Sequence, residues 1–171
     1  MFALIVLICG EFTPLVVIAI SSIVPWTCRI PKQIASDREK VELRRKASFR
    51  NLTVHPPTER GVSGLGREQL MHINDSLGLS SSMWDYFDAV LTNGLLRRKV
   101  RRRIEYLGMD DRLIRVYPHG VREMEDEEVK MACVERGIDV VGKSESDVRR
   151  GLSAWLKSAE KVPIEKLLLT R

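Results

Sequence analysis

The sequence LLRRKVRRRIEYL, residues 95–107, is the clearest indication of how this chain folds. Its apolar residues recur at the three- and four-residue spacing that places side chains on one side of an α-helix. These residues are Leu96, Val100, Ile104 and Leu107. Basic residues occupy most of the other positions. The stretch therefore predicts a helix with one buried apolar side and a strongly charged exposed side.

The segments before this stretch also have helical spacing. The run REQLMHINDSL is followed by Gly78, a residue that commonly ends helices. Ser82 and Asp85 resemble a capping box at the start of the segment WDYFDAVL. We expect Gly94 to end that second helix. The sequence thus predicts two helices ahead of the basic stretch.

The segments after the basic stretch complete a helical pattern. DDRLIRVY, residues 110–117, predicts a short helix of its own that Pro118 stops. EMEDEEVKMACVERG predicts a further helix that ends at Gly137, and a last clear helix opens at Ser144. No run of useful length alternates with the period of a strand. We therefore predict an all-α fold.

The first 24 residues, MFALIVLICGEFTPLVVIAISSIV, form an apolar run with one carboxylate, Glu11. About 20 apolar residues are enough to cross the ~30 Å hydrocarbon core of a bilayer as a helix. We expect a transmembrane helix over residues 1–28, a charged juxtamembrane helix and linker over residues 29–65, and a helical domain over residues 66–171. A secretory signal peptide is the weaker alternative, because no basic residue precedes the run.

The residues after the apolar run indicate the orientation in the membrane. Arg29, Lys32 and Arg38 follow it closely, and basic residues favour the cytosolic or matrix side. The three cysteines cannot all pair, which favours a reducing compartment. Glycosylation tripeptides at Asn51 and Asn74 argue for secretion, but such tripeptides arise easily by chance.

The sequence offers few groups that could carry out catalysis. His55, His72 and His119 are scattered, and no Cys-x-x-Cys, His-Glu-x-x-His or phosphate-binding glycine loop is present. Asp110 does not begin an EF-hand loop, because the required alternation of oxygen ligands is missing. We expect no metal and no cofactor. The sequence favours a binding protein over an enzyme.

The strongest functional signal after the apolar run is a cluster of six basic residues. They are Arg97, Arg98, Lys99, Arg101, Arg102 and Arg103. Such clusters attract phosphate backbones and anionic headgroups, in agreement with the net charge of +5. The alternative is a charged helix face that only contacts water. Because no aromatic residue interrupts the cluster, a nucleic-acid contact would be to the backbone rather than to bases.

Glu11 is the second candidate functional residue. An ionisable group at membrane depth is expensive, and such groups often serve ion or proton pathways. The alternative is a tolerated carboxylate with no transport role. Because a single helix encloses no pore, transport would require a homo-oligomer or partner helices.

Three segments, in order along the chain, resemble the LETM family, the leucine-zipper and EF-hand transmembrane proteins of the mitochondrial inner membrane. GEFTPLVV followed by VPWTC resembles the membrane segment of the family. NGLLRRKVRRRIEYLGMDDRLI resembles its arginine-rich helix. GVREMEDEEVKMACVERGI, SDVRRGLSAWL and VPIEKLLL are similar to its closing helices. The resemblance covers nearly the whole chain.

This resemblance implies an inner-membrane protein whose helical bundle, similar to 14-3-3 proteins, faces the matrix and binds the mitochondrial ribosome. The contact would be to ribosomal RNA phosphate or to a ribosomal protein. The resemblance also implies roles in translation-coupled insertion and ion homeostasis. Glu11 matches the intramembrane glutamate of the family, and the basic cluster lies on its arginine-bearing helix. The zipper and EF-hand segments are missing, which implies a short, divergent member.

Two other functions remain open. The chain could be a subunit of a potassium–proton or calcium–proton exchanger that uses Glu11. Alternatively, residues 125–156 are similar to SAP domains, which bind nucleic acid through a pair of capped helices. The predicted membrane helix disfavours nuclear DNA as the target.

The predicted topology can be tested by protease protection. Because basic residues follow the apolar run, the domain after residue 28 should lie inside the inner membrane. Protease added to mitoplasts should therefore leave it uncut, as judged by an antibody to the C-terminus. Digestion while the inner membrane is intact, or glycosylation at Asn51, would contradict this orientation.

Overall fold

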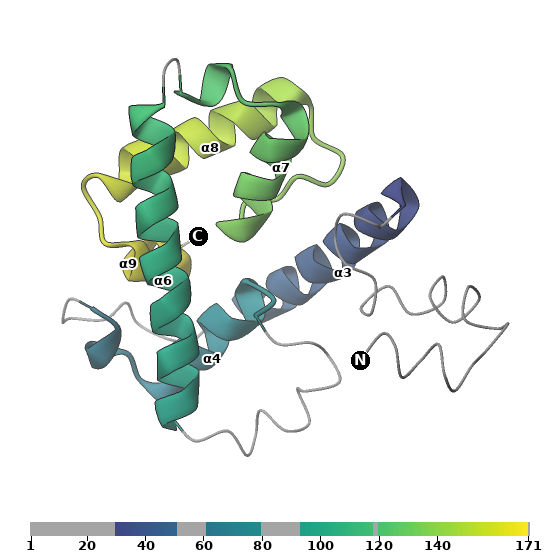
Figure 1. Ribbon diagram of the computed structural model, residues 1–171. Helices are drawn as coiled ribbons and strands as arrows, with labels where there is room; N and C mark the ends of the chain where they lie inside the picture. Colours follow the sequence, from purple (N-terminus) through teal and green to yellow (C-terminus); the bar gives the residue numbers. More distant parts are fainter. Residues whose placement is uncertain (1–29, 51–60, 80–92, 118–119, 171) are drawn as a thin grey trace, which may run out of the picture. The chain divides into compact units, whose positions relative to one another are not determined.

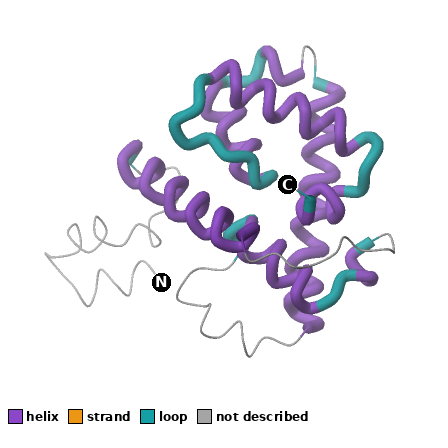
Figure 2. The backbone as a smooth tube through the Cα atoms, turned by 180° about the vertical axis from the view of Figure 1, so that it is seen from behind, coloured by secondary structure: helices purple, strands orange, loops and turns teal. Residues whose placement is uncertain are grey.

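The computed structural model describes residues 30–50, 61–79, 93–117 and 120–170. Within these ranges all regular structure is helical, as Figure 2 shows, so the predicted all-α fold is confirmed for this part of the chain. The elements, labelled in Figure 1, are α3 (Pro31–Arg50), η4 (Val62–Gly64), α4 (Arg67–Ser76), α6 (Asn93–Val116), η5 (Gly120–Arg122), α7 (Asp126–Glu135), α8 (Glu145–Ala159) and α9 (Ile164–Leu169).

The chain divides into two compact units, residues 1–39 and residues 40–171. The second unit contains the C-terminal half of α3 and all the helices that follow it. Among the described residues, no helix combines the length and apolarity that a membrane crossing requires. The predicted transmembrane helix over residues 1–28, with Glu11, lies outside the described residues.

Helix α6 is longer than the sequence predicted, and two expectations were wrong. Residues 110–116 do not form a separate helix but continue α6 to Val116. Gly94 does not end a helix, because it lies in the first turn of α6. The helix continues because no proline interrupts it and because Asp111 and Ile114 extend its buried side. Gly108, in its middle, lies where Ile164 of α9 packs against α6.

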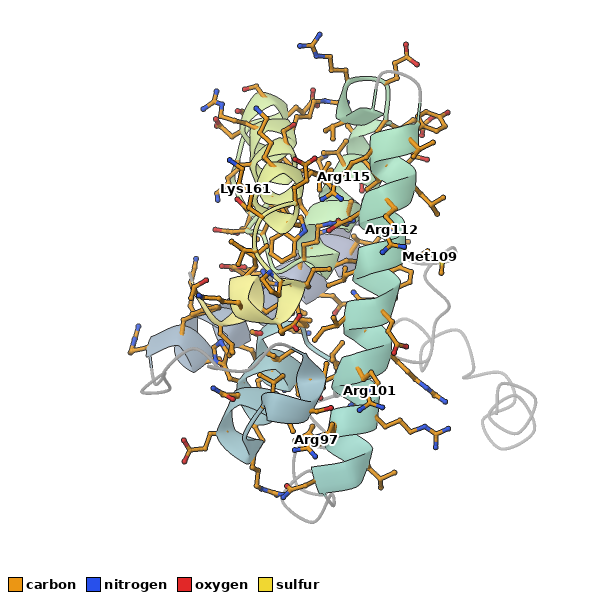
Figure 3. All side chains as sticks on the ribbon, turned by 90° about the vertical axis from the view of Figure 1, so that its left-hand side faces the viewer. Arg97, Arg101, Met109, Arg112, Arg115 and Lys161 are labelled. Atoms are coloured by element: carbon orange, nitrogen blue, oxygen red, sulfur yellow. The ribbon has the colours of Figure 1, made fainter. Side chains whose placement is uncertain are left out.

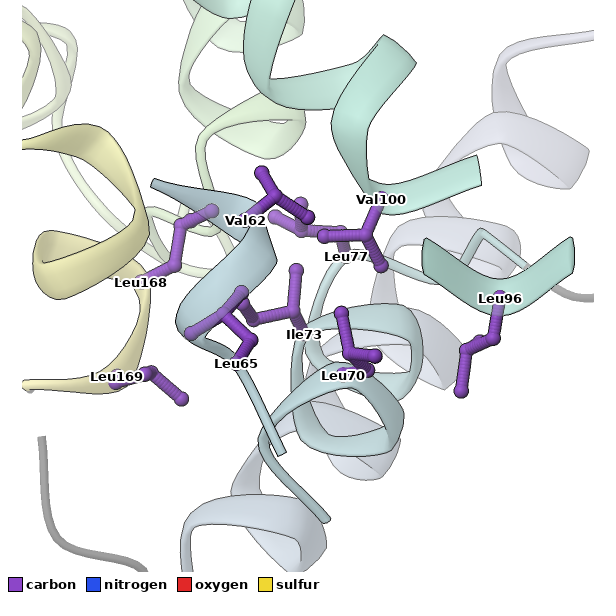
Figure 4. Close-up of a cluster of buried hydrophobic side chains, with 9 residues drawn as sticks. All are labelled: Val62, Leu65, Leu70, Ile73, Leu77, Leu96, Val100, Leu168 and Leu169. Carbon is purple, nitrogen blue, oxygen red and sulfur yellow. The ribbon is translucent and has the colours of Figure 1, made fainter. Parts of the chain in front are cut away.

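One hydrophobic cluster joins α4 to the N-terminal half of α6 (Figure 4). As predicted from the spacing, Leu96 and Val100 are buried, and so are the apolar residues of α4. The full cluster is Val62, Leu65, Leu70, Ile73, Leu77, Leu96, Val100, Leu168 and Leu169. Val62 of η4 and two leucines of α9 belong to it, so the cluster joins four elements.

A second hydrophobic cluster joins α7 and α8 to the C-terminal half of α6 through Ile114. Trp155 of α8 packs against both clusters and so connects them. Cys133 lies in the second cluster, where burial raises the pKa of its thiol to about 11. The thiol, which donates to the carbonyl of Val148, is therefore protonated at neutral pH and unreactive.

Three helix ends agree with the predicted signals. After α7, Gly137 adopts φ +77°, and its amide donates to Val134 while the next amide donates to Cys133. This is a Schellman motif, which needs the left-handed conformation that glycine adopts readily. Gly78 ends α4 in the same way, with φ +59°. Ser144 caps α8 by accepting from the amide of Asp147 at 3.3 Å.

A buried ion pair fastens α7 to α6. Arg136, at the end of α7, donates from Nε to Asp111 Oδ1 at 2.9 Å and from Nη2 to Asp110 Oδ2 at 2.6 Å. Its Nη1 donates to the carbonyl of Ala132, and Trp155 Nε1 donates to Asp111 Oδ2 at 3.2 Å. Burial alone lowers the pKa of Arg136, but its bonds to the two aspartates outweigh burial and raise this pKa. One network thus joins α6, α7 and α8.

A second buried arginine, Arg45 of α3, binds the ends of two other helices. Its Nε donates to the carbonyl of Ser76, the last residue of α4, at 2.8 Å. Its Nη2 donates to the carbonyl of Val134, in the last turn of α7, at 3.3 Å. Glu42 balances its charge, with 2.5 Å between Nη1 and Oε2. Arg45 therefore satisfies the carbonyl of Ser76, one of those that a helix C-terminus leaves without an internal partner, and it is a second donor to the carbonyl of Val134.

The Asp111–Arg136 pair gives a direct stability prediction. In Asp111→Ala, Arg136 stays buried with only Asp110 to balance its charge. The substitution should lower the free energy of unfolding by about 3–5 kcal/mol. The double variant Asp111→Ala with Arg136→Met should lose clearly less than the sum of the two single losses, because the two fully buried charges are then both absent. Urea unfolding of the full chain followed by circular dichroism measures both. Additive losses would contradict the pairing.

Candidate functional site

The predicted basic cluster lies on the N-terminal half of α6, and the structure divides it into two groups. The side chains of Arg98, Arg101 and Arg102 are exposed. The other three residues, Arg97, Lys99 and Arg103, are half-buried. The sequence predicted a broad solvent-exposed face for all six. The structure brings only half of them to the solvent.

Two of the half-buried arginines bind neighbouring elements. Arg97 Nη2 donates to the carbonyl of Leu65 at 3.2 Å and so connects α6 to the residue after η4. Arg103 Nη2 donates to the carbonyl of Glu135 at 3.4 Å and lies 3.7 Å from its carboxylate. The Arg103 guanidinium also lies 5.1 Å from the ring centroid of Tyr106. These two side chains stabilise the fold, and they are poorly placed to bind an external partner.

The exposed group, Arg98, Arg101 and Arg102, we call the arginine trio. Within the part of the chain that the structure describes, none of its side chains forms an ion pair or a hydrogen bond. Residues three and four apart on a helix are neighbours, so Arg98 has both other arginines beside it. Three guanidinium groups are therefore concentrated on about one helical turn.

The same side of α6 carries a further arginine that the sequence analysis missed. Arg112 is exposed and lies 11 residues after Arg101, about three helical turns, so the two share one side of α6 (Figure 3). Helical spacing would have revealed this alignment had residues 110–117 been assigned to the same helix. Glu105, also exposed, lies between them and reduces the positive charge there.

Arg115 is the next arginine along α6, but it is bound to α8. Its Nη2 donates to the carbonyl of Leu156 at 2.7 Å, and its Nε lies 3.7 Å from Glu160. Asp110 and Asp111 are likewise occupied by Arg136. Asp110 and Asp111 therefore do little to offset the charge of the arginine trio, which leaves Glu105 as the acidic residue of α6 beside it.

The described residues give no indication of a metal site. Among them, no group of three or more His, Cys, Asp or Glu side chains could hold an ion. His72 is buried, with its Nδ1 2.7 Å from the hydroxyl of Ser48, and burial lowers its pKa. It is therefore neutral at physiological pH. His55, His119 and Glu11 lie outside the described residues.

Helices α7 and α8 form the capped pair that resembles a nucleic-acid-binding module, but two of its arginines have structural roles. Arg136 is buried in the network described above. Arg149 donates to the carbonyls of Val121 and Met124 at 2.6 and 2.8 Å and binds Asp126. This bond lowers the pKa of Asp126. The arginine trio on α6 is therefore the better candidate surface for an anionic partner.

The comparisons with known proteins agree with the extent of the helical unit. A family model described as "LETM1-like, RBD" matches residues 42–171. The match includes Arg45, the arginine trio and the Arg136 network. No curated protein and no solved structure matches the chain.

The division of the basic cluster predicts different effects for two arginines on the same helix. Arg97→Ala should lower the free energy of unfolding by about 1 kcal/mol, because the carbonyl of Leu65 loses its donor. Arg101→Ala should change it by less than about 0.5 kcal/mol, because this side chain is exposed. Urea unfolding of the two variants gives the comparison. Equal losses would mean that the two arginines do not differ in structural role.

Proposed function

The chain belongs to the LETM1-like ribosome-binding-domain family, and we propose that its helical unit binds the mitochondrial ribosome from the matrix side of the inner membrane. The observation that supports this function best is the arginine trio. It is exposed, has no partner among the described residues and lies within the region that the family model matches. The proposed ligand is the phosphate backbone of ribosomal RNA.

The chemistry of the arginine trio suits phosphate. The planar guanidinium group presents several donors in a fixed geometry and binds phosphate oxygens in pairs. The opposite side of α6 is packed through Leu96 and Val100, so the arginines extend from a helix whose position is fixed. Little conformational freedom is lost when a partner binds such a preformed surface. The arrangement favours binding by charge and shape rather than by base sequence.

Membrane attachment would keep such a ribosome contact close to the bilayer. The predicted transmembrane helix over residues 1–28 precedes the helical unit by only a short segment. A ribosome held there would release new chains beside the membrane, which is how the protein would support translation-coupled insertion. Cation–proton exchange through Glu11 stays a prediction from the sequence.

The proposed contact can be tested by reversing the charge of the arginine trio. The variant Arg98→Glu, Arg101→Glu, Arg102→Glu, made in the full chain in nanodiscs, should bind mitochondrial ribosomes at least tenfold more weakly in co-sedimentation. Its helical circular dichroism should be unchanged, because these exposed side chains form no hydrogen bond or ion pair among the described residues. Wild-type binding should weaken as salt rises, with a slope of about −3 in log affinity against log salt if each arginine neutralises one phosphate.

A matched variant controls for net charge. Lys46→Glu, Arg150→Glu, Lys157→Glu changes the charge by the same amount at three exposed positions on α3 and α8. It should bind ribosomes within about twofold of wild type. Equal weakening in both triple variants would show that only net charge matters. Wild-type binding that ignores salt would also contradict a phosphate contact.

A further inference from the structure

Exposed apolar side chains are concentrated around the C-terminal half of α6. Of the ten large apolar residues exposed in the described part of the chain, six lie on this half-helix, directly after it or on α7. They are Tyr106, Met109, Leu113, Val116, Tyr117 and Met131. Contiguous exposed apolar surface of this kind marks interaction sites more often than scattered residues do. The arginine trio does not account for it.

Four of these side chains line a groove between α6 and α7. The groove has a volume of about 340 Å³, and Tyr106, Leu113, Tyr117 and Met131 form much of its apolar lining. Both helices belong to the same compact unit. Methionine and tyrosine are well suited to a binding surface, because methionine adapts its shape and tyrosine gives a large apolar area.

Bonds between α6 and α7 fix the walls of the groove. On the α6 side, the hydroxyl of Tyr106 donates to Glu135 Oε2 of α7 at 3.0 Å, which fixes the ring at one end. Beneath it, the Asp110–Arg136 bond fastens the two helices to each other. A partner would therefore meet walls whose spacing is already set, and it would bind without the cost of ordering them.

The edges of the groove carry negative charge. Asp110, Glu128 and Glu135 all line it. Arg136 and Arg103 offset Asp110 and Glu135, but Glu128 is exposed and its side chain only caps the amide of Glu125. Carboxylates repel phosphates, which disfavours RNA and anionic lipid as occupants. A groove with an apolar floor and acidic edges instead complements a helix whose apolar side is flanked by basic residues.

We propose that the groove between α6 and α7 binds an amphipathic helix of a basic partner protein. Apolar side chains of that helix pack between Tyr106, Leu113 and Met131, and its lysines or arginines lie against Glu128. This is the helix-in-groove mode of recognition. The surface shares no residue with the arginine trio, so the proposal does not depend on RNA binding.

The test uses the full chain in zwitterionic nanodiscs and a designed peptide as the probe. The peptide contains only leucine and lysine, with leucine at helical i, i+3, i+4, i+7 spacing. Methionine methyl signals report where it binds: Met131 and Met124 line the groove, whereas Met71 packs against the other hydrophobic cluster. We expect the peptide to shift the Met131 and Met124 signals and to leave Met71 unchanged. Empty nanodiscs give the background.

Two substitutions on α6 provide a matched pair. Leu113 lies in the groove and is 64% exposed, and Met109 is 67% exposed but does not line it. Leu113→Asn should weaken peptide binding at least tenfold, while Met109→Asn should change it less than twofold. Glu128→Gln keeps the cap acceptor but removes the charge, and it should weaken binding by a smaller factor. A leucine–glutamate peptide with the same spacing should not bind.

Three outcomes would overturn the proposal. Unchanged affinity in Leu113→Asn would place the peptide elsewhere. Equal binding of the leucine–glutamate peptide would remove the argument from charge. A concentration-dependent dimer in sedimentation, abolished by Leu113→Asn, would assign the groove to a second copy of this chain instead. Ribosome binding of the same variants, measured separately, distinguishes failure here from failure of the arginine-trio contact.

Discussion

The buried contact between Arg136 and the aspartates in the C-terminal half of α6 is the interaction on which the rest of the helical unit depends. Arg136 Nε and Nη2 lie within 2.9 Å of Asp111, and the same carboxylate accepts from Trp155 of α8. Three helices therefore share one charged centre beside two hydrophobic clusters. A buried charge is tolerated only in such a complete network, so this contact fixes how α7 lies on α6 and how wide the groove between them is.

The periodicity of the sequence predicted most of the described helices, although it divided α6 in two, and it did not predict the contacts between helices. Leu96 and Val100 followed directly from apolar spacing, and Gly137 and Ser144 from capping chemistry. Asp111 was missed because an apolar pattern counts only apolar residues, although it lies four residues after Leu107 on the same side of the helix. A carboxylate in that position requires a buried cation. The identity of this cation, Arg136, depends on a contact across 25 residues that local spacing does not contain.

The sequence predicted which helix carries the candidate surface, but only some of the residues exposed on it. A run of six basic residues indicates a charged helix. In the structure, the exposed members of the run are Arg98, Arg101 and Arg102. The roles of Arg97 and Arg103 are set by the carbonyls of Leu65 and Glu135, which approach α6 from elsewhere in the chain. No property of the run itself separates the two groups. Sequence therefore locates the surface, while tertiary packing selects the residues on it.

The position of Arg45 has a consequence for the order of events during synthesis. Its acceptor in α7, Val134, is 89 residues further along the chain. At a translation rate of 5–20 residues per second, that residue is made about 4–18 s after Arg45. During this interval, the guanidinium can bind Glu42 and Ser76 but not the carbonyl of Val134. The C-terminal half of α3 can therefore pack on α4 first, but it completes its contacts with the unit only after α7 has emerged.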